Sequence, residues 1–249
     1  MHTNQKGITK QINIDTFFVR DAHEKRASYL WRYTQKMDRR NMNKYQVTIL
    51  VFVVVLLTAC AGVGVVATSD PLTKLNDAEH LFMNQDRPLI AERLIHEAMA
   101  IYEERGDNRG LGHAHREYAD LLLSNSVIKW HKYYKENGFR DSSVTFENRS
   151  KKAEEYYSKA LEFYSQAEKR LLQNKKYDLL TNIYFNMAWS SYKVGKESSA
   201  CIFYDKTLSA YEENIKQYPN SKPFIPAGYD SFQEFIGSRK KGMKCKNSV

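Results

Sequence analysis

Three cysteines carry the most reactive side chains of this sequence, and their surroundings differ. Cys60 lies within a stretch without charged residues that runs from Val47 to Ala67, whereas Cys201 and Cys245 lie far downstream. A thiol that directly follows an apolar run can be a core residue, a disulfide partner or a point of covalent attachment. The residues around each cysteine therefore indicate which of these three roles it has.

Other residue types that support catalysis occur without the spacing that catalysis needs. His113 and His115 are two positions apart, so on a helix they point to different faces and cannot both bind one metal ion. The sequence contains no HExxH, nucleophile elbow, phosphate-binding glycine loop or CxxC. Carboxylate pairs such as Glu103-Glu104 and Glu212-Glu213 are typical of solvated helix faces. We therefore expect no enzyme activity, no metal and no cofactor.

The positive charge is concentrated before the apolar run. The 249-residue chain has a formal charge of +9. Residues 1–59 hold ten basic against four acidic residues, a net +6, and residues 60–249 hold 28 basic against 25 acidic residues, a net +3. A net +3 over the larger part predicts no affinity for nucleic acid.

A basic segment followed by an apolar run and small residues is typical of an export signal. If translation starts at Met42, residues 42–59 form an eighteen-residue leader with Lys44 as its basic end, and residues 1–41 lie upstream of the start. Otherwise residues 1–41 form a basic cytoplasmic arm.

Leu57-Thr58-Ala59-Cys60 resembles the lipobox of bacterial lipoproteins, where a signal peptidase cuts before the cysteine. The resemblance implies that Cys60 is lipidated and that residues 60–70 form a tether. Three acyl chains hold a protein almost permanently, at ~0.8 kcal/mol per buried CH₂. The alternative is an uncut membrane anchor over residues 46–67, which is long enough to span a bilayer. Both alternatives place residues 70–249 in the periplasm or an equivalent exported space.

The remainder of the chain repeats one helical pattern. A small residue is followed four positions later by a large one and three positions after that by another small one, which places all three on one helix face. The pattern occurs within residues 91–99, 153–161 and 200–208. Small residues allow a neighbouring helix to approach, and the large residue fills the space between them.

The third occurrence belongs to a 34-residue unit, 181–214, which resembles the tetratricopeptide repeat. The matching residues are Tyr184, Met187, Ala188, Gly195, Ala200 and Tyr204. Thr207 departs from the pattern, where alanine is usual, and the terminal proline is missing.

The resemblance implies an all-α fold: a tetratricopeptide-like solenoid of helical hairpins over residues 71–217, with about three repeats. The first repeat pairs helices at 74–84 and 88–105. The second pairs 109–123 with a helix from about 149, so residues 124–148 form an insertion. Residues 218–249 form a proline-rich connector, followed by a capping helix at 229–241 and a tail.

Repeats of this family line a concave groove with the first helix of each pair. The resemblance implies protein-binding residues there, and the aromatic insertion could add more: Asn182, Phe185, Trp189, Arg116, Trp130 and Tyr134. Two alternatives stay open, namely that Trp189 packs between repeats and that the insertion buries its own aromatics. The lysine and asparagine of the chaperone-type carboxylate clamp are replaced by Asn76 and His80, which disfavours that ligand class.

With Cys60 lipidated, Cys201 and Cys245 remain in a compartment that oxidises thiols, so we expect a disulfide between them. Cys201 lies on the second helix of the third repeat, and Cys245 follows the capping helix. The alternative is a buried free thiol at Cys201 and a frayed tail.

Together these features predict a tethered, non-enzymatic adaptor or assembly factor at the periplasmic face of the bacterial outer membrane. Ala61, rather than aspartate after the cysteine, favours that membrane. In plan the chain resembles the pilotins of type IV pili and the repeat-bearing lipoproteins that bring envelope enzymes together. The expected partners are envelope proteins, with no nucleic acid and no small-molecule substrate. The alternative is a single-pass inner-membrane protein that serves a secretion or division complex.

Overall fold

The computed structural model describes residues 68–220 and 224–245. This part of the chain is all-α, as predicted, and contains no strand. Its helices are α3 (Pro71–Asn84), α4 (Pro88–Arg105), α5 (Asn108–Leu123), α6 (Asn125–Lys129), α7 (His131–Asn137), α8 (Arg149–Gln173), α9 (Tyr177–Lys193), α10 (Glu197–Gln217) and α11 (Phe232–Gly242).

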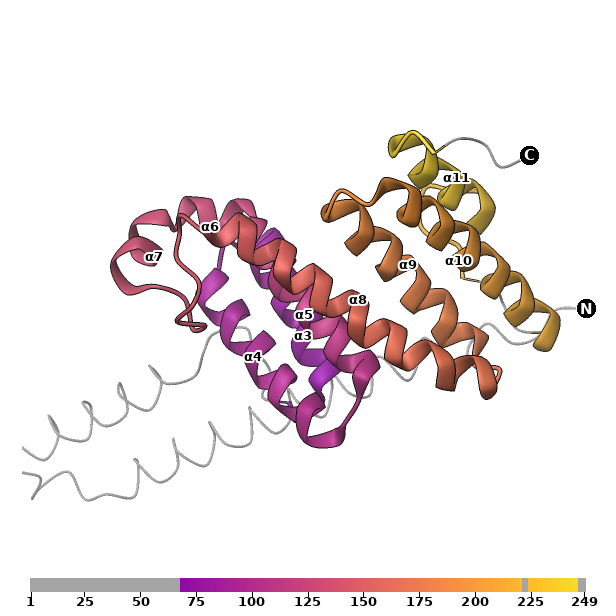
Figure 1. Cartoon of the computed structure of the whole chain (residues 1–249), viewed down its shortest axis with the longest axis horizontal. Coiled ribbons are helices and arrows are strands. Elements are labelled where there is room, and N and C mark those ends of the chain that lie inside the picture. The colour runs from indigo at the N-terminus through magenta and orange to yellow at the C-terminus, as the bar shows by residue number, and fades with distance from the viewer. Residues whose placement is uncertain (1–67, 221–223, 246–249) are drawn as a thin grey trace, which may run out of the picture. The chain divides into compact units, whose positions relative to one another are not determined.

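The six long helices pack in pairs. Helix α3 lies against α4, α5 against α8, and α9 against α10 (Figure 1). Each pair also contacts the next one, through α4 with α5 and through α8 with α9. The first helices of the pairs touch one another as well, α3 with α5 and α5 with α9. The first helices therefore form one continuous layer.

The small-large-small pattern marks the faces along which the pairs pack. All nine of its residues are 0 % exposed: Ala91, Ile95, Ala98, Ala153, Tyr157, Ala160, Ala200, Tyr204 and Thr207. The prediction that these positions share a buried helix face is confirmed. Burying a large apolar side chain contributes ~1.5–3 kcal/mol, which applies to the large residue of each pattern, while the small residues let the paired helices approach closely.

Local signals account for most helix ends. The Asp70 side chain accepts a hydrogen bond from the backbone N–H of Thr73 at the start of α3, and Asp107 caps α5 in the same way through Gly110. Gly106 ends α4 in the left-handed conformation, with φ of 60°. These caps separate α3, α4 and α5, and α3 begins at Pro71, three residues before the predicted start at residue 74.

The third pair differs from its predicted bounds. Helix α8 runs 25 residues to Gln173, and α9 begins at Tyr177 rather than at Thr181. Between them Lys175 takes a φ of 51°, and the N–H of Lys176 bonds to the carbonyl oxygen of Leu171. The turn is thus made by a lysine where local rules expect glycine or asparagine.

The insertion after α5 folds against the rest of the chain. Its two short helices are α6, which contacts α3 and α5, and α7. The Tyr134 ring stacks on Phe139 at 4.1 Å between centroids, and both side chains are buried. For Tyr134 and Phe139, the structure therefore agrees with the alternative in which the insertion buries its own aromatic residues.

Helix α11 packs on α10 through Phe232, Phe235 and Ile236, all buried. The structure joins Cys201 to Cys245 by a disulfide, with 5.7 Å between their Cα atoms. An ion pair from Lys240 to Asp205 at 2.6 Å lies between the same two elements.

Within residues 68–220 and 224–245, no helix combines the length and apolar character needed to cross a bilayer. The predicted leader, the alternative anchor at 46–67 and Cys60 all lie outside these residues.

Candidate binding groove

Two adjoining hollows lie along the layer of first helices, and a third lies beside them between α9, α10 and α11. Their volumes are about 730, 530 and 400 Å³, and Phe185 of α9 lines all three. We call them the aromatic hollow, the Trp189 hollow and the His113 hollow, and the three together the groove. Because neighbouring hollows share lining residues, an extended ligand could contact α3, α5, α9 and α11 at once.

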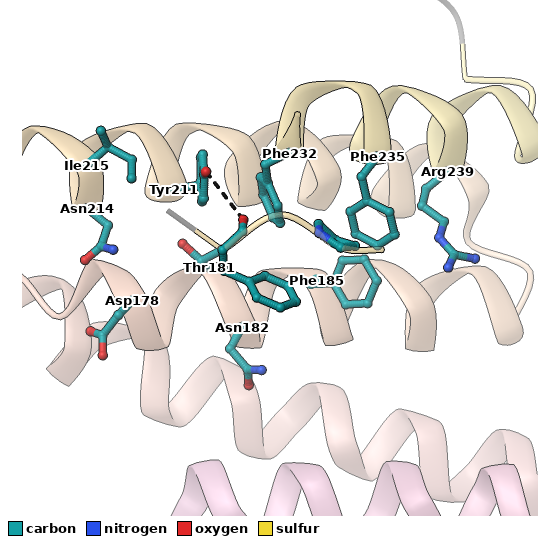
Figure 2. Close-up of a pocket in the computed structure, with 12 residues that line it drawn as sticks. Asp178, Thr181, Asn182, Phe185, Tyr211, Asn214, Ile215, Phe232, Phe235 and Arg239 are labelled. Carbon is teal, nitrogen blue, oxygen red and sulfur yellow. Dashed lines mark hydrogen bonds between the residues drawn. The ribbon is translucent and has the colours of Figure 1, made fainter. Parts of the chain in front are cut away.

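The aromatic hollow lies between α9, α10, α11 and the connector before α11. Figure 2 shows the rings of Phe185, Phe232 and Phe235 at its middle, with Arg239 at one end and Asp178 at the other. Phe185 stacks on Phe235 with 5.5 Å between centroids, and the Arg239 guanidinium lies 5.1 Å from the Phe235 centroid. This hollow therefore offers an apolar, aromatic surface with charge only at its ends.

A charged cluster lies on α5 beside the other two hollows. Arg116 donates hydrogen bonds to Glu117 Oε2 and, at 2.6 Å, to Asp120 Oδ2. Asp120 Oδ1 also accepts from the Tyr157 hydroxyl at 2.5 Å and from the Trp189 indole N–H at 3.0 Å. Asp120 thus receives three donors from three helices.

Glu117 is the least satisfied member of this cluster. Its side chain is 3 % exposed, and Oε1 is buried without a hydrogen-bond partner in the described part of the chain. Burial raises the pKa of Glu117 to about 8, with Glu79 and Asp120 adding to the effect and the Arg116 guanidinium opposing it. Arg116 shows the converse: burial lowers its pKa, but the carboxylates of Glu117 and Asp120 outweigh burial and raise it above the ordinary value.

The two histidines of α5 are packing residues in the structure. The Nδ1 atom of His113 lies 3.0 Å from the Tyr164 hydroxyl, and the His115 ring stacks on Phe163 at 5.2 Å. Burial lowers the pKa of His113 to about 3 and that of His115 to about 4, so both are neutral at pH 7. No group of three metal-ligating side chains occurs among the residues that the structure describes.

Four of the predicted partner-binding residues line the groove: Asn182, Phe185, Trp189 and Arg116. Trp189 and Phe185 also pack, half-buried, against the core formed by α9, α10 and α11. Each of these two aromatic residues therefore has one side in the core and one side on a hollow.

The two insertion residues lie elsewhere. Tyr134 is 1 % exposed, so its prediction as an exposed anchor is wrong; the folded insertion encloses its ring. Trp130 is 38 % exposed, lines none of the three hollows, and donates its indole N–H to the Asp86 carbonyl oxygen at 3.0 Å. Its contribution to partner binding stays a prediction, and any such contribution would be separate from the groove.

Sequence reasoning missed several residues that define the groove, namely Glu79, Glu117, Asp120 and Arg239. Arg116 and Asp120 are four residues apart, a spacing that suggests an ion pair on a helix. Nothing local marks Glu79 or Arg239, because each reaches the groove only through the packing of α3 or α11.

Comparison of the chain with protein-family models, with curated proteins and with solved structures finds no match.

Proposed function

We propose that this protein is a lipid-tethered adaptor or assembly factor of the bacterial envelope, whose groove binds an extended segment of a protein partner. Its helices are assigned to a tetratricopeptide-like solenoid, in which α3, α5 and α9 are the first helices of three repeats. Cys60 carries the lipid, and the outer membrane is the proposed location.

Two features support the solenoid assignment. The helices pack as consecutive pairs whose first members also contact one another, which is the neighbour pattern of a helical repeat array. The nine positions of the repeated pattern are all fully buried, so the same pattern marks a buried face in α4, α8 and α10.

The observation that carries the binding function is the continuity of the groove. Phe185 lines all three hollows, and residues of α3, α5, α9 and α11 line the Trp189 hollow together. An extended segment has the shape to occupy such a groove, and aromatic and arginine side chains dominate the energetics of protein interfaces. Phe185, Trp189 and Arg239 supply these side-chain types.

Photocrosslinking in the living bacterium tests the groove. Asn182 is exposed and lines two hollows, so a p-benzoylphenylalanine at this position of the full chain should crosslink to an envelope protein. Glu155 is exposed on α8 and lines no hollow, which makes the same replacement there a matched control. An absence of crosslinked protein from Asn182, or identical products from both positions, would contradict the proposal.

The tether has its own test. Radiolabelled palmitate should be incorporated into the wild-type chain and not into the Cys60→Ser variant. Recovery of an intact peptide spanning Thr58 to Asp70 from the membrane protein would show that the chain is not cleaved before Cys60.

A further inference from the structure

The Trp189 and His113 hollows meet at a point with an excess of carboxylates. The residues that line both hollows are Glu79, Arg116, Glu117, Phe185 and Asn186. Glu79 comes from α3, Arg116 and Glu117 from α5, and Phe185 and Asn186 from α9. We call this point the junction.

Positive charge at the junction does not balance the carboxylates. Among the residues that the structure describes, Arg116 is the one cation that lines both hollows, and it already binds Glu117 Oε2 and Asp120 Oδ2. Glu79 is exposed and forms no ion pair within the described residues, and Glu117 Oε1 is buried without a partner. The Arg116 guanidinium is therefore shared by Glu117 and Asp120, while Glu79 has no cation bound to it within the described residues.

An unpartnered buried carboxylate oxygen is costly, and a cation that donates a hydrogen bond to it removes the cost. The other charged residues of these hollows are Arg109 in the His113 hollow, and Lys193 and Arg239 in the Trp189 hollow. None of these three lines both hollows. A cationic group of a ligand at the junction would supply the hydrogen-bond donor that Glu117 Oε1 lacks among the described residues.

The walls of the junction suit a long aliphatic stem. Phe185 provides an aromatic face at the junction itself, while Phe82, Met83 and Trp189 continue the apolar surface along the Trp189 hollow. Lysine and arginine bury their methylene stems on such surfaces and keep the charged end at a polar site. A cation beside an aromatic ring gains further attraction.

We propose that the junction binds the side chain of a lysine or arginine in an extended partner segment, with Glu117 and Glu79 as the recognising carboxylates and Phe185 against the stem. This inference rests on the proposed function, because it names the chemistry of the segment that the groove receives. It assigns a basic residue to the partner at the point where α3, α5 and α9 meet.

A random peptide library displayed on phage tests the inference, with the full chain in detergent as the immobilised target. Peptides selected by the wild type should be enriched in lysine and arginine over the starting library. Glu117→Gln keeps the shape of the side chain and removes its charge, so the enrichment should disappear. Glu155→Gln, on α8 away from the groove, should select the same peptides as the wild type.

The affinity of one selected peptide then measures the interaction between its basic residue and Glu117 directly. Replacement of its basic residue with norleucine should weaken binding to the wild type at least tenfold, since charge-assisted hydrogen bonds are the strong ones. The same replacement should have little effect on binding to Glu117→Gln. If Glu117→Gln fails to fold, as judged by its melting curve, Glu79→Gln decides the question, because Glu79 is exposed and its substitution leaves the core intact.

Proton release gives an independent signature. Without a ligand, burial raises the pKa of Glu117 above its ordinary value, while the Arg116 guanidinium opposes this shift. A bound cation favours the ionised form, so the wild type should bind the basic peptide more tightly at pH 8.5 than at pH 6.5, and Glu117→Gln should lose this dependence.

The outcomes separate the two proposals. Selected peptides without basic enrichment, or basic peptides that Glu117→Gln and Glu79→Gln both bind as the wild type does, would overturn this inference and leave the peptide-binding groove standing. Selection of no peptide at all by the wild type would overturn both.

Discussion

Reduction of the bond between Cys201 and Cys245 should destabilise the domain by an amount that follows from its loop. The two residues are 44 positions apart, so the bond closes a loop that contains most of α10, the connector and α11. The chain-entropy relation, with a loop of this length, gives a stabilisation of ~4 kcal/mol at 25 °C. With a urea m-value of about 2 kcal/mol per molar, the unfolding midpoint should fall by about 2 M on reduction.

Urea denaturation followed by far-ultraviolet circular dichroism measures this shift. The measurement is best made on the Cys60→Ser chain, in which Cys201 and Cys245 are the remaining cysteines. The oxidised protein is compared with the same protein in reductant, and a chain with both cysteines replaced by serine provides the control, because reductant should not alter its midpoint. Coincident curves for the oxidised and reduced protein would refute the reasoning. Alkylation of both thiols in the folded protein without reductant would show that the bond does not form.

Substitutions at Gly110 and His115 test the environment of α5, with Gly237→Ala in α11 as the control for the first. Gly110→Ala would place a Cβ 2.1 Å from a ring carbon of buried Tyr102, so we expect a loss of ~1–3 kcal/mol in the free energy of unfolding. Gly237→Ala, which meets no atom within 4 Å in α11, should instead gain up to ~1 kcal/mol; equal effects would contradict the packing argument. Burial lowers the pKa of His115 to about 4, below the unfolded value of about 6.5, so this residue should cost stability as the pH falls through that window. His115→Phe retains a ring against Phe163. Between pH 7 and pH 4.5, its free energy of unfolding should fall by roughly 2.5 kcal/mol less than that of the wild type. If urea denaturation shows the same fall for both proteins, His115 is not the group responsible.

Most helices were predictable because their signals are local. Apolar periodicity predicts α4 at its observed bounds, α5 within one residue and α3 with a start three residues late, and Pro88 and Gly106 lie at the two ends of α4 in the structure. The turn between α8 and α9 was not predictable, since Lys175 adopts a left-handed conformation that carries no sequence signal.

In the insertion, too, some features were evident from the sequence and others were set by the fold. Its aromatic content was evident in the sequence, but the aromatic residues are irregularly spaced, so the sequence does not indicate which of them share a buried face. Whether an aromatic ring there is exposed depends on how the loop folds back. In the structure Tyr134 stacks beneath Phe139, while Trp130 stays partly exposed and bonds to the α3–α4 turn.

The sequence by itself determined the all-α class, the helix faces and the nine buried positions of the repeated pattern, because side-chain periodicity along a helix is a local property. The groove required the tertiary structure. Glu79, Glu117 and Phe185 belong to three helices that are far apart in the chain, and only the contacts of α3 with α5 and of α5 with α9 bring them together. Whether a carboxylate is solvated, paired or left without a partner depends on the atoms around it in space, so the unpartnered Glu117 oxygen at the junction is a property of the packed helices and not of the sequence.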